Sequence, residues 1–304
     1  MAYTLTILGA NSAIPTAYRY PTAQLLDIYQ SFYLIDCGEG TQMQLRRNRI
    51  KMQRIGCIFI SHMHGDHYFG LFGLLNTMHL LGRKRPLKLF GPPDLWHLVQ
   101  QTLDQADAHF NYEVIWTPLS HGKSQVIHED QFVKVSTIPL DHRIATNGFL
   151  FEETPKKRKL KKELLRELDI PVNQLSAIKD GEDYIDEDGA VFPNARLTTD
   201  PQPARSYAFC SDTRYNERIV PFIKNVDLLY HEATFVNDMK GRASATYHST
   251  AEEAATIAKK ANVKKLLLGH YSARYKHLDQ HLVEAKAVFN NSHLAMEGKR
   301  IEVE

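Results

Sequence analysis

The sequence has few cysteines and no sign of a disulfide framework. Among 304 residues there are three cysteines, Cys37, Cys57 and Cys210, and none has the C-x-x-C spacing of a metal knuckle. An odd number without paired spacing argues against disulfides and suits a reducing compartment. Each cysteine lies in or beside an apolar stretch, so we expect three small buried groups.

The sequence also has little net charge and no long apolar run. The formal net charge is only +2, so overall charge does not indicate nucleic-acid binding and any basic surface must be local. The N-terminus MAYTLTILGANSAIPT lacks the basic and apolar regions of a signal peptide. No window reaches the ~18 apolar residues that span a bilayer. These absences predict a cytoplasmic protein with no membrane segment.

Strand and helix patterns alternate along most of the chain, which favours one α/β domain. The predicted strands are 3–9, 23–28, 31–36, 57–60, 87–90, 112–117, 132–138, 147–152, 206–210, 227–230 and 263–268. Helices are predicted from near Gly38 through Arg49, over 68–81, after Pro93, and over 216–223, 250–261 and 277–289. Thr250 followed by Glu253 is a capping-box pattern.

Residues 155–204 interrupt this alternation. They begin with the basic, helix-like PKKRKLKKELLREL and continue as an acidic, polar stretch with few large apolar residues. A segment of this length is too long for an ordinary connection and usually marks a functional or mobile element. We therefore predict one domain over 1–304 with an inserted arm at 155–204 that is not part of the core.

The strongest chemical signal is SHMHGDH at 61–67, directly after the apolar run CIFI. Imidazole and carboxylate groups are the ligands that zinc takes in catalytic sites. A tight turn presents alternate residues to different sides, so His62 and His64 are expected to share one metal while Asp66 and His67 face a second. A polar loop that contains histidines by chance is the weaker interpretation.

One loop cannot complete two metal sites, and three later residues qualify as further ligands. His142, Asp212 and His270 each follow a predicted strand. The carboxyl ends of strands are where α/β active sites collect. Taken alone, each would be a surface or supporting residue, but beside the first motif each is predicted to be a ligand.

These motifs resemble those of the metallo-β-lactamase superfamily, and in particular its ribonuclease Z branch. The resemblance rests on YLIDCGEGTQ, SHMHGDH, the later histidine, CSDT, the HEATF and HST segments at 231–235 and 248–250, and LGHYSARY. It covers most of the chain. It implies an αββα sandwich of two mixed β-sheets flanked by helices, with a flexible arm inserted.

The resemblance also implies roles for individual residues. His62, His64 and His142 would hold one Zn²⁺ ion, Asp66, His67 and His270 a second, and Asp212 would bridge the two ions of each subunit. Asp36 would hold the ligand loop in place. Asp66 would also orient the attacking hydroxide, and His248, oriented by Glu232, would protonate the leaving 3′ oxygen.

The implied activity is endonucleolytic removal of the 3′ trailer from precursor tRNA, which leaves a 3′-hydroxyl on the tRNA. The main alternative is a zinc phosphodiesterase or related hydrolase acting on a small-molecule ester, because fold does not fix function. A non-catalytic binding protein on the same fold is a weaker alternative, since such proteins usually lose metal ligands. A homodimer is expected from the family.

Two basic clusters are candidate RNA contacts. In the arm, the resemblance implies substrate binding by Lys156, Lys157, Arg158, Lys159, Lys161 and Lys162. The arm departs from the family pattern, because Ile170-Pro171-Val172-Asn173-Gln174 lacks the usual Gly-Pro pair, which puts the manner of tRNA engagement in doubt. A second cluster over 46–54 either guides RNA toward the metal or is a solvated helix face.

Overall fold

A computed structural model describes residues 3–304, which form two compact units. The larger unit comprises 3–152 and 205–304, and the smaller unit comprises 153–204. The larger unit contains two seven-stranded mixed sheets. The first sheet has the order β20 (Arg300–Glu302), β1 (Tyr3–Gly9), β3 (Ala23–Ile28), β4 (Ser31–Ile35), β5 (Ile55–Phe59), β6 (Leu87–Gly91) and β7 (Val114–Pro118).

The second sheet packs face to face against the first. Its order is β19 (Ser292–Leu294), β17 (Lys265–Gly269), β16 (Leu228–Glu232), β15 (Ser206–Cys210), β10 (Asn147–Glu153), β9 (Val133–Pro139) and β8 (Val126–Glu129). Large apolar side chains from both sheets, such as Phe59 and Phe149, fill the space between them. Burial of such side chains is the dominant favourable term in folding.

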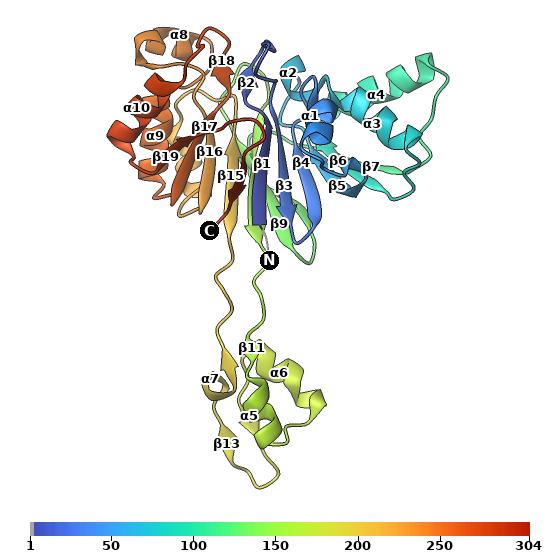
Figure 1. Cartoon of the computed structure of the whole chain (residues 1–304), viewed down its shortest axis with the longest axis vertical. Helices are drawn as coiled ribbons and strands as arrows, with labels where there is room; N and C mark the ends of the chain where they lie inside the picture. Colours follow the sequence, from blue (N-terminus) through green and yellow to red (C-terminus); the bar gives the residue numbers. More distant parts are fainter. Residues whose placement is uncertain (1–2) are drawn as a thin grey trace. The chain divides into compact units, whose positions relative to one another are not determined.

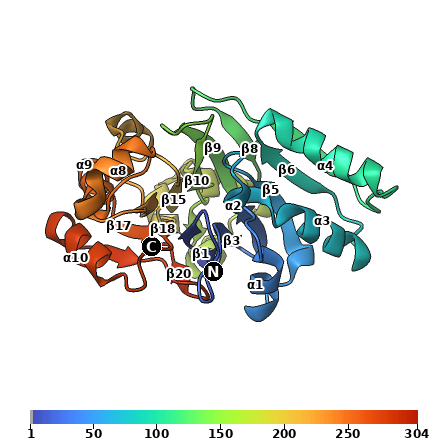
Figure 2. The ribbon, with the colours of Figure 1, turned by 90° about the horizontal axis from the view of Figure 1, so that it is seen from above.

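Helices cover the outer face of each sheet (Figure 1 and Figure 2). Outside the first sheet lie α1 (Thr41–Arg47), α3 (Leu71–Leu80) and α4 (Pro93–Gln105), and outside the second lie α9 (Ala251–Lys260) and α10 (Asp279–Val288). A separate apolar cluster joins α3 to the first sheet through Leu71, Leu74 and Leu75. The layers are therefore helix, sheet, sheet, helix, and the predicted αββα sandwich is confirmed.

Local sequence signals explain several element boundaries. The Thr250 hydroxyl accepts from the backbone N–H of Glu253, and the Glu253 carboxylate accepts from the N–H of Thr250, so the predicted capping box begins α9. All three cysteines are free and buried, as predicted. No helix within residues 3–304 has the length and apolar character needed to cross a membrane.

The helix predicted over 68–81 is divided. A short helix α2 (Gly65–Tyr68) ends before Phe69, and α3 begins at Leu71. The backbone of Gly70 lies against the backbone of Gly38, where an added Cβ would stand 2.1 Å from the Gly38 carbonyl oxygen. Gly70 also donates its N–H to the carbonyl of Cys37. This close tertiary contact separates the two helices.

Other predictions of secondary structure were also incomplete. Residues 216–223 form a 3₁₀ helix, Glu217–Phe222, with Pro221 inside, rather than an α-helix. Strands β8, β19 and β20 were not predicted. Each is an edge strand of three or four residues, and pairing with its one neighbour makes so short a segment extended.

The smaller unit has a small apolar core of its own, separate from the apolar clusters of the larger unit. Its buried apolar side chains are Ile170, Ile178, Tyr184 and Leu197. Its elements are β11 (Lys159–Leu160), α5 (Lys162–Glu167), α6 (Leu175–Asp180), β12 (Tyr184–Ile185), β13 (Val191–Phe192), α7 (Asn194–Leu197) and β14 (Thr198–Thr199). The basic stretch is only partly helical because β11 pairs with β14.

Candidate metal centre

The candidate site lies where the carboxyl ends of strands from both sheets meet. Strands β4 and β5 run parallel in the first sheet, and β15, β16 and β17 run parallel in the second. Asp36 follows β4, Asp212 follows β15 and His270 follows β17. All three have left-handed backbone conformations, with φ of 55°, 60° and 57°. Such conformations are uncommon outside glycine and often occur at functional sites.

The seven predicted ligands converge in one place. Atoms of His62, His64, His142 and Asp212 lie within 4.8 Å of one another, and so do atoms of Asp66, His67 and His270. A third overlapping group of Asp212, His248 and His270 meets the same limit. This His/Asp cluster is capable of binding metal.

The first group presents three imidazole nitrogens at close range. Nδ1 of His64 lies 3.0 Å from Nε2 of His62 and 3.2 Å from Nε2 of His142. Nitrogen ligands of one tetrahedral zinc stand about 3.3 Å apart, given Zn–N bonds of about 2.0–2.1 Å. Burial lowers the pKa of His62 well below its usual value, and burial also lowers the pKa of His64 and His142. Neutral imidazoles are the form that binds metal.

The second group is arranged around two carboxylates. Nε2 of His67 and of His270 lie 3.2 and 3.0 Å from Oδ1 of Asp212, and each lies 3.5 Å from Oδ2 of Asp66. Despite these distances, neither buried Nε2 has a hydrogen-bond partner within residues 3–304. Nitrogen atoms that point between carboxylate oxygens without bonding to them fit a shared cation.

The charges of this group depend on one another. Burial opposes ionisation of Asp212, but the imidazoles of His270 and His67 outweigh it and hold the pKa of Asp212 well below its usual value. Burial likewise opposes protonation of His270, yet Asp212 raises the pKa of His270 to about 10. Without a metal, the carboxylates are therefore ionised and protons on the two imidazoles balance their charge; a bound cation would take the place of those protons.

Asp36 holds the ligand loop, residues 61–67, in place through hydrogen bonds. One carboxylate oxygen of Asp36 accepts from Nδ1 of His67 at 2.6 Å, and the other accepts from the backbone N–H of Ser61 at 2.8 Å. The Ser61 hydroxyl also donates to Asp36 and lies 2.9 Å from Nδ1 of His62. A ligand histidine whose far nitrogen bonds a carboxylate is the usual supporting arrangement at metal sites.

A second histidine–carboxylate pair stands beside the cluster. Nδ1 of His248 donates to Oε1 of Glu232 at 2.9 Å, and Glu232 is fully buried. Burial opposes protonation of His248, but Glu232 outweighs it and raises the pKa of His248. The structure thus brings the two residues together as an oriented pair that favours a protonated imidazole.

Some supporting residues were not singled out from the sequence. The Thr234 hydroxyl donates to Glu232 at 2.7 Å and lies 3.0 Å from Nδ1 of His270. The backbone N–H of Ala13 donates to Oδ2 of Asp66 at 2.7 Å. Thr234 lies within the HEATF segment, which was the available signal. A backbone donor such as that of Ala13 leaves no trace in the sequence.

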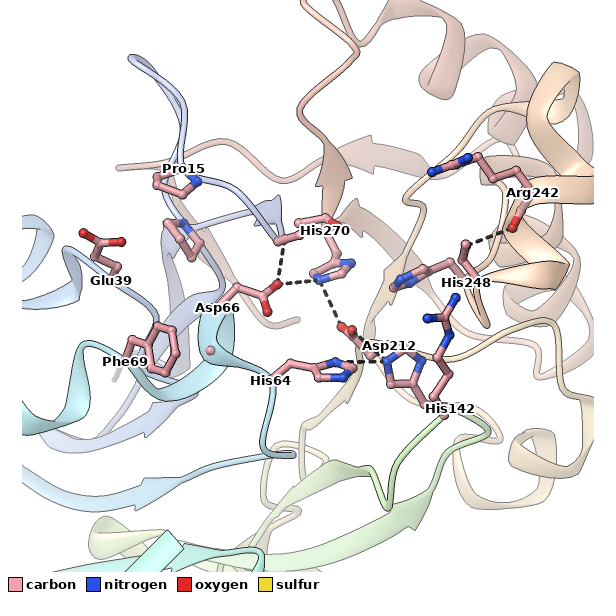
Figure 3. A pocket seen from close by; sticks show the side chains of 16 residues that line it. Pro15, Glu39, His64, Asp66, Phe69, His142, Asp212, Arg242, His248 and His270 are labelled. Atoms are coloured by element: carbon pink, nitrogen blue, oxygen red, sulfur yellow. Dashed lines mark hydrogen bonds and ion pairs between the residues drawn. The ribbon is translucent and has the colours of Figure 1, made fainter. Parts of the chain in front are cut away.

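Five of the seven cluster residues line a pocket of about 650 Å³, namely His64, Asp66, His142, Asp212 and His270 (Figure 3). Its rim differs from side to side. Phe69 and Glu39 stand on one side, and Arg242 stands on the other near His248. Phe69 is 60% exposed although its ring packs on the backbone of Gly65. The pocket therefore offers an aromatic surface and a cationic side around the candidate metal ligands.

The predicted arm contacts lie in the smaller unit, and most of them already have partners. Lys156 pairs with Glu153 at 3.0 Å, Lys157 with Asp180 at 2.7 Å, and Arg158 with Asp200. Lys161 donates to two backbone carbonyls, those of residues 195 and 196. Within residues 3–304, no ion pair involves Lys159 or Lys162.

Comparison with known proteins identifies the family. Ribonuclease Z of Porphyromonas gingivalis W83 is 44% identical over 302 residues, which cover 99% of both chains. Ribonuclease Z of Cytophaga hutchinsonii is 46% identical over 304 residues, which cover 100% of this chain and 97% of that protein. This chain belongs to the ribonuclease Z family. The family resemblance drawn from the sequence is therefore confirmed.

A solved structure agrees with this membership, and a family model with a different description matches about half of the chain. The crystal structure of human tRNase Z, short form, is 26% identical, covers 99% of both chains and superimposes with a TM-score of 0.74. The family model described as Anti-Pycsar protein Apyc1 matches residues 3–155, which include the SHMHGDH motif. The ribonuclease Z family accounts for the whole chain, including the residues that supply Asp212, His248 and His270.

Proposed function

We propose that this chain is a zinc-dependent endoribonuclease that removes the 3′ trailer from tRNA precursors. The observation that carries the proposal is the seven-residue His/Asp cluster, five of whose members line one pocket together with His248, which Glu232 orients from behind. Full-length relationship to proteins named Ribonuclease Z and to human tRNase Z supports precursor tRNA as the substrate.

The residues present fit two zinc ions. His62, His64 and His142 would hold one ion, Asp66, His67 and His270 the other, and Asp212 would contact both. The support is the close approach of their nitrogen and oxygen atoms and the unbonded, buried Nε2 atoms of His67 and His270. When bound, the ions supply Lewis acidity toward the phosphoryl oxygens and hydroxide at neutral pH.

The protein's own groups would handle the protons. Asp66 would orient the attacking water and accept its proton, while the N–H of Ala13 holds one of its oxygens. His248 would give a proton to the leaving 3′ oxygen. Glu232 accepts from Nδ1 of His248, which leaves Nε2 to carry that proton. The tRNA would then end in a 3′-hydroxyl and the trailer would keep the phosphate.

A decisive test is cleavage of a 3′-extended tRNA precursor by the zinc-loaded protein, with bis(4-nitrophenyl) phosphate as a small diester. We expect a cut near the 3′ end of the tRNA. If the protein hydrolyses the small diester and leaves the precursor intact, the alternative of a small-molecule esterase replaces the proposal. If neither substrate reacts while two equivalents of zinc are bound, both hydrolase functions are excluded.

The arm is proposed to bind the body of the tRNA at a distance from the cut. Lys159 and Lys162 are the best placed for phosphate contacts, since the other four basic residues predicted for this role have partners in the same unit. We further propose a homodimer in the cytoplasm. Light scattering on the purified protein tests the dimer, and cell fractionation tests the compartment.

A further inference from the structure

Three loops that carry site residues are linked to one another by the residues next to them in sequence. His142 lies in the loop after β9, Asp212 in the loop after β15, and His248 in the loop before α9. The linking residues are Asp141, Arg214 and Tyr247. Each of them is within two positions of a site residue, yet the three come from distant parts of the chain.

Arg214 joins the first two loops. Its Nε donates to Oδ2 of Asp141 at 2.8 Å, and its backbone N–H donates to the Asp141 carbonyl at 3.1 Å. In return the backbone N–H of Asp141 donates to the hydroxyl of Thr213 at 3.1 Å. These backbone and side-chain hydrogen bonds thus fix the positions of the two loops relative to each other.

Tyr247 joins the third loop to the other two. The guanidinium carbon of Arg214 lies 4.6 Å from the centre of the Tyr247 ring, within the range of a cation–π contact. The backbone of Tyr247 has a φ of 60°, which is rare for a bulky residue and persists only where the surroundings impose it. The guanidinium of Arg214, stacked on the Tyr247 ring, is a contact that helps to hold this backbone conformation.

The conformation of Tyr247 has a direct consequence for His142. The Tyr247 carbonyl lies 3.0 Å from Nδ1 of His142, and a carbonyl can only accept, so Nδ1 carries the proton. Nε2 is then unprotonated and lies 3.2 Å from Nδ1 of His64. The carbonyl thereby selects the tautomer of His142 that can bind metal at Nε2.

We propose that Asp141, Arg214 and Tyr247 form a clip that positions His142 for metal binding. The clip residues are positioning residues, because they act through His142 and do not touch the reacting atoms. Arg214 is not among the residues that line the pocket. The inference rests on the proposed function, since it assumes that the His/Asp cluster holds metal.

The clip is not explained by a contribution to the stability of the fold. The side chains of Arg214 and Asp141 are 42% and 36% exposed, and exposed ion pairs contribute little to the free energy of unfolding. Removal of Arg214 should therefore leave the apo protein folded. By contrast, substitution of a residue that supports a metal ligand typically lowers metal affinity by about 10- to 100-fold.

The test is zinc affinity, measured by competition with a chromophoric chelator, for wild type, Arg214→Ala and Arg218→Ala. Arg218 is an exposed arginine four positions further along the same segment and serves as the matched control. We expect Arg214→Ala to weaken binding of one zinc ion by roughly 10- to 100-fold. Arg218→Ala should bind both ions as wild type does.

Activity provides a second readout that a structural role would not give. At limiting zinc, kcat of Arg214→Ala on the tRNA precursor should fall while KM stays within about twofold, and excess zinc should restore kcat. Tyr247→Phe keeps the ring and should behave as wild type, whereas Tyr247→Leu should resemble Arg214→Ala. These two variants also keep the proposal testable if Arg214→Ala fails to fold.

The possible results separate the clip from the function on which it rests. If wild type binds no zinc, the proposed function fails and the clip fails with it. If wild type binds two zinc ions and Arg214→Ala and Tyr247→Leu bind them equally well, the clip alone is overturned. Loss of affinity in both variants with rescue by excess zinc supports the clip.

Discussion

The candidate metal centre and the arm unit, residues 153–204, both contain many charged residues but arrange them in opposite ways. In the candidate metal centre, His67 and Asp212 are buried, and Nε2 of His67 lies 3.2 Å from Oδ1 of Asp212. In the arm, Lys157 and Asp180 pair at 2.7 Å while their side chains are 59% and 47% exposed. Buried charges interact strongly because little water screens them, whereas exposed pairs are screened by water and salt.

The arm has no net positive charge, although its proposed partner is RNA. The arm holds nine lysines and arginines against eleven aspartates and glutamates. An arm that binds RNA must therefore do so with a local basic surface and not with its overall charge. A dense run of charge in the sequence is therefore weaker evidence for a site than a few residues that converge. Four predictions test this contrast.

The largest effect is expected in the pocket. Asp66→Ala should lower kcat by roughly 10²- to 10⁴-fold on both the tRNA precursor and a small diester, because Asp66 is the proposed acceptor of the water's proton and a proposed metal ligand. Asp104→Ala, at an exposed position of α4, is the control and should leave kcat unchanged. Equal rates for wild type and Asp66→Ala would remove Asp66 from the chemistry.

Replacement of 153–204 by a short Gly-Ser linker should separate the two regions. We expect kcat/KM on precursor tRNA to fall by about 10²-fold, since a second binding module raises overall affinity by this order. Hydrolysis of bis(4-nitrophenyl) phosphate and zinc content should not change, because the pocket residues lie in the other unit. Undiminished tRNA cleavage would rule out the arm as a substrate-binding element.

Glu232→Gln tests the orienting pair with little change in volume. Glu232 raises the pKa of His248, so its loss should let the imidazole lose its proton at lower pH. The alkaline limb of kcat/KM should move to lower pH, and kcat should fall by about 10- to 100-fold. A pH profile that stays in place would show that His248 does not act as the acid.

The smallest effect is expected from single lysines of the arm. Lys159→Ala or Lys162→Ala should each reduce the slope of log affinity for tRNA against log salt by about one. Lys157→Ala is the comparison, because Lys157 already pairs with Asp180 and should change the slope less. Filter binding at several salt concentrations measures these slopes. Identical slopes for all three variants would contradict phosphate contacts by the unpaired lysines.

Much of the fold was predictable because the relevant signals are local. Strands 23–28 and 206–210 have the predicted limits, since each is an apolar run bounded by turns. The capping box at Thr250 was likewise readable in the sequence. The division between α2 and α3 was not, because it depends on the contact of Gly70 with Gly38.

The arm shows where sequence patterns were insufficient. Its few apolar residues are spread over 160–197 and have no clear period, so the sequence does not show whether they pack together. In the structure Ile170, Ile178, Tyr184 and Leu197 meet in one cluster. Four scattered side chains make a core only when turns bring them together, and that is a tertiary property.

For the site, the sequence by itself determined which residue types were available and in what order. The motif SHMHGDH and the later His142, Asp212 and His270 were identified as candidate ligands, and their binding of metal is still a prediction. Only the tertiary structure decided that the seven side chains converge, because parallel strands from two sheets end at one edge. It alone revealed the carbonyl of Tyr247 and the N–H of Ala13 as supports. Every residue carries these backbone groups, so the sequence cannot distinguish the ones that the fold directs toward a site.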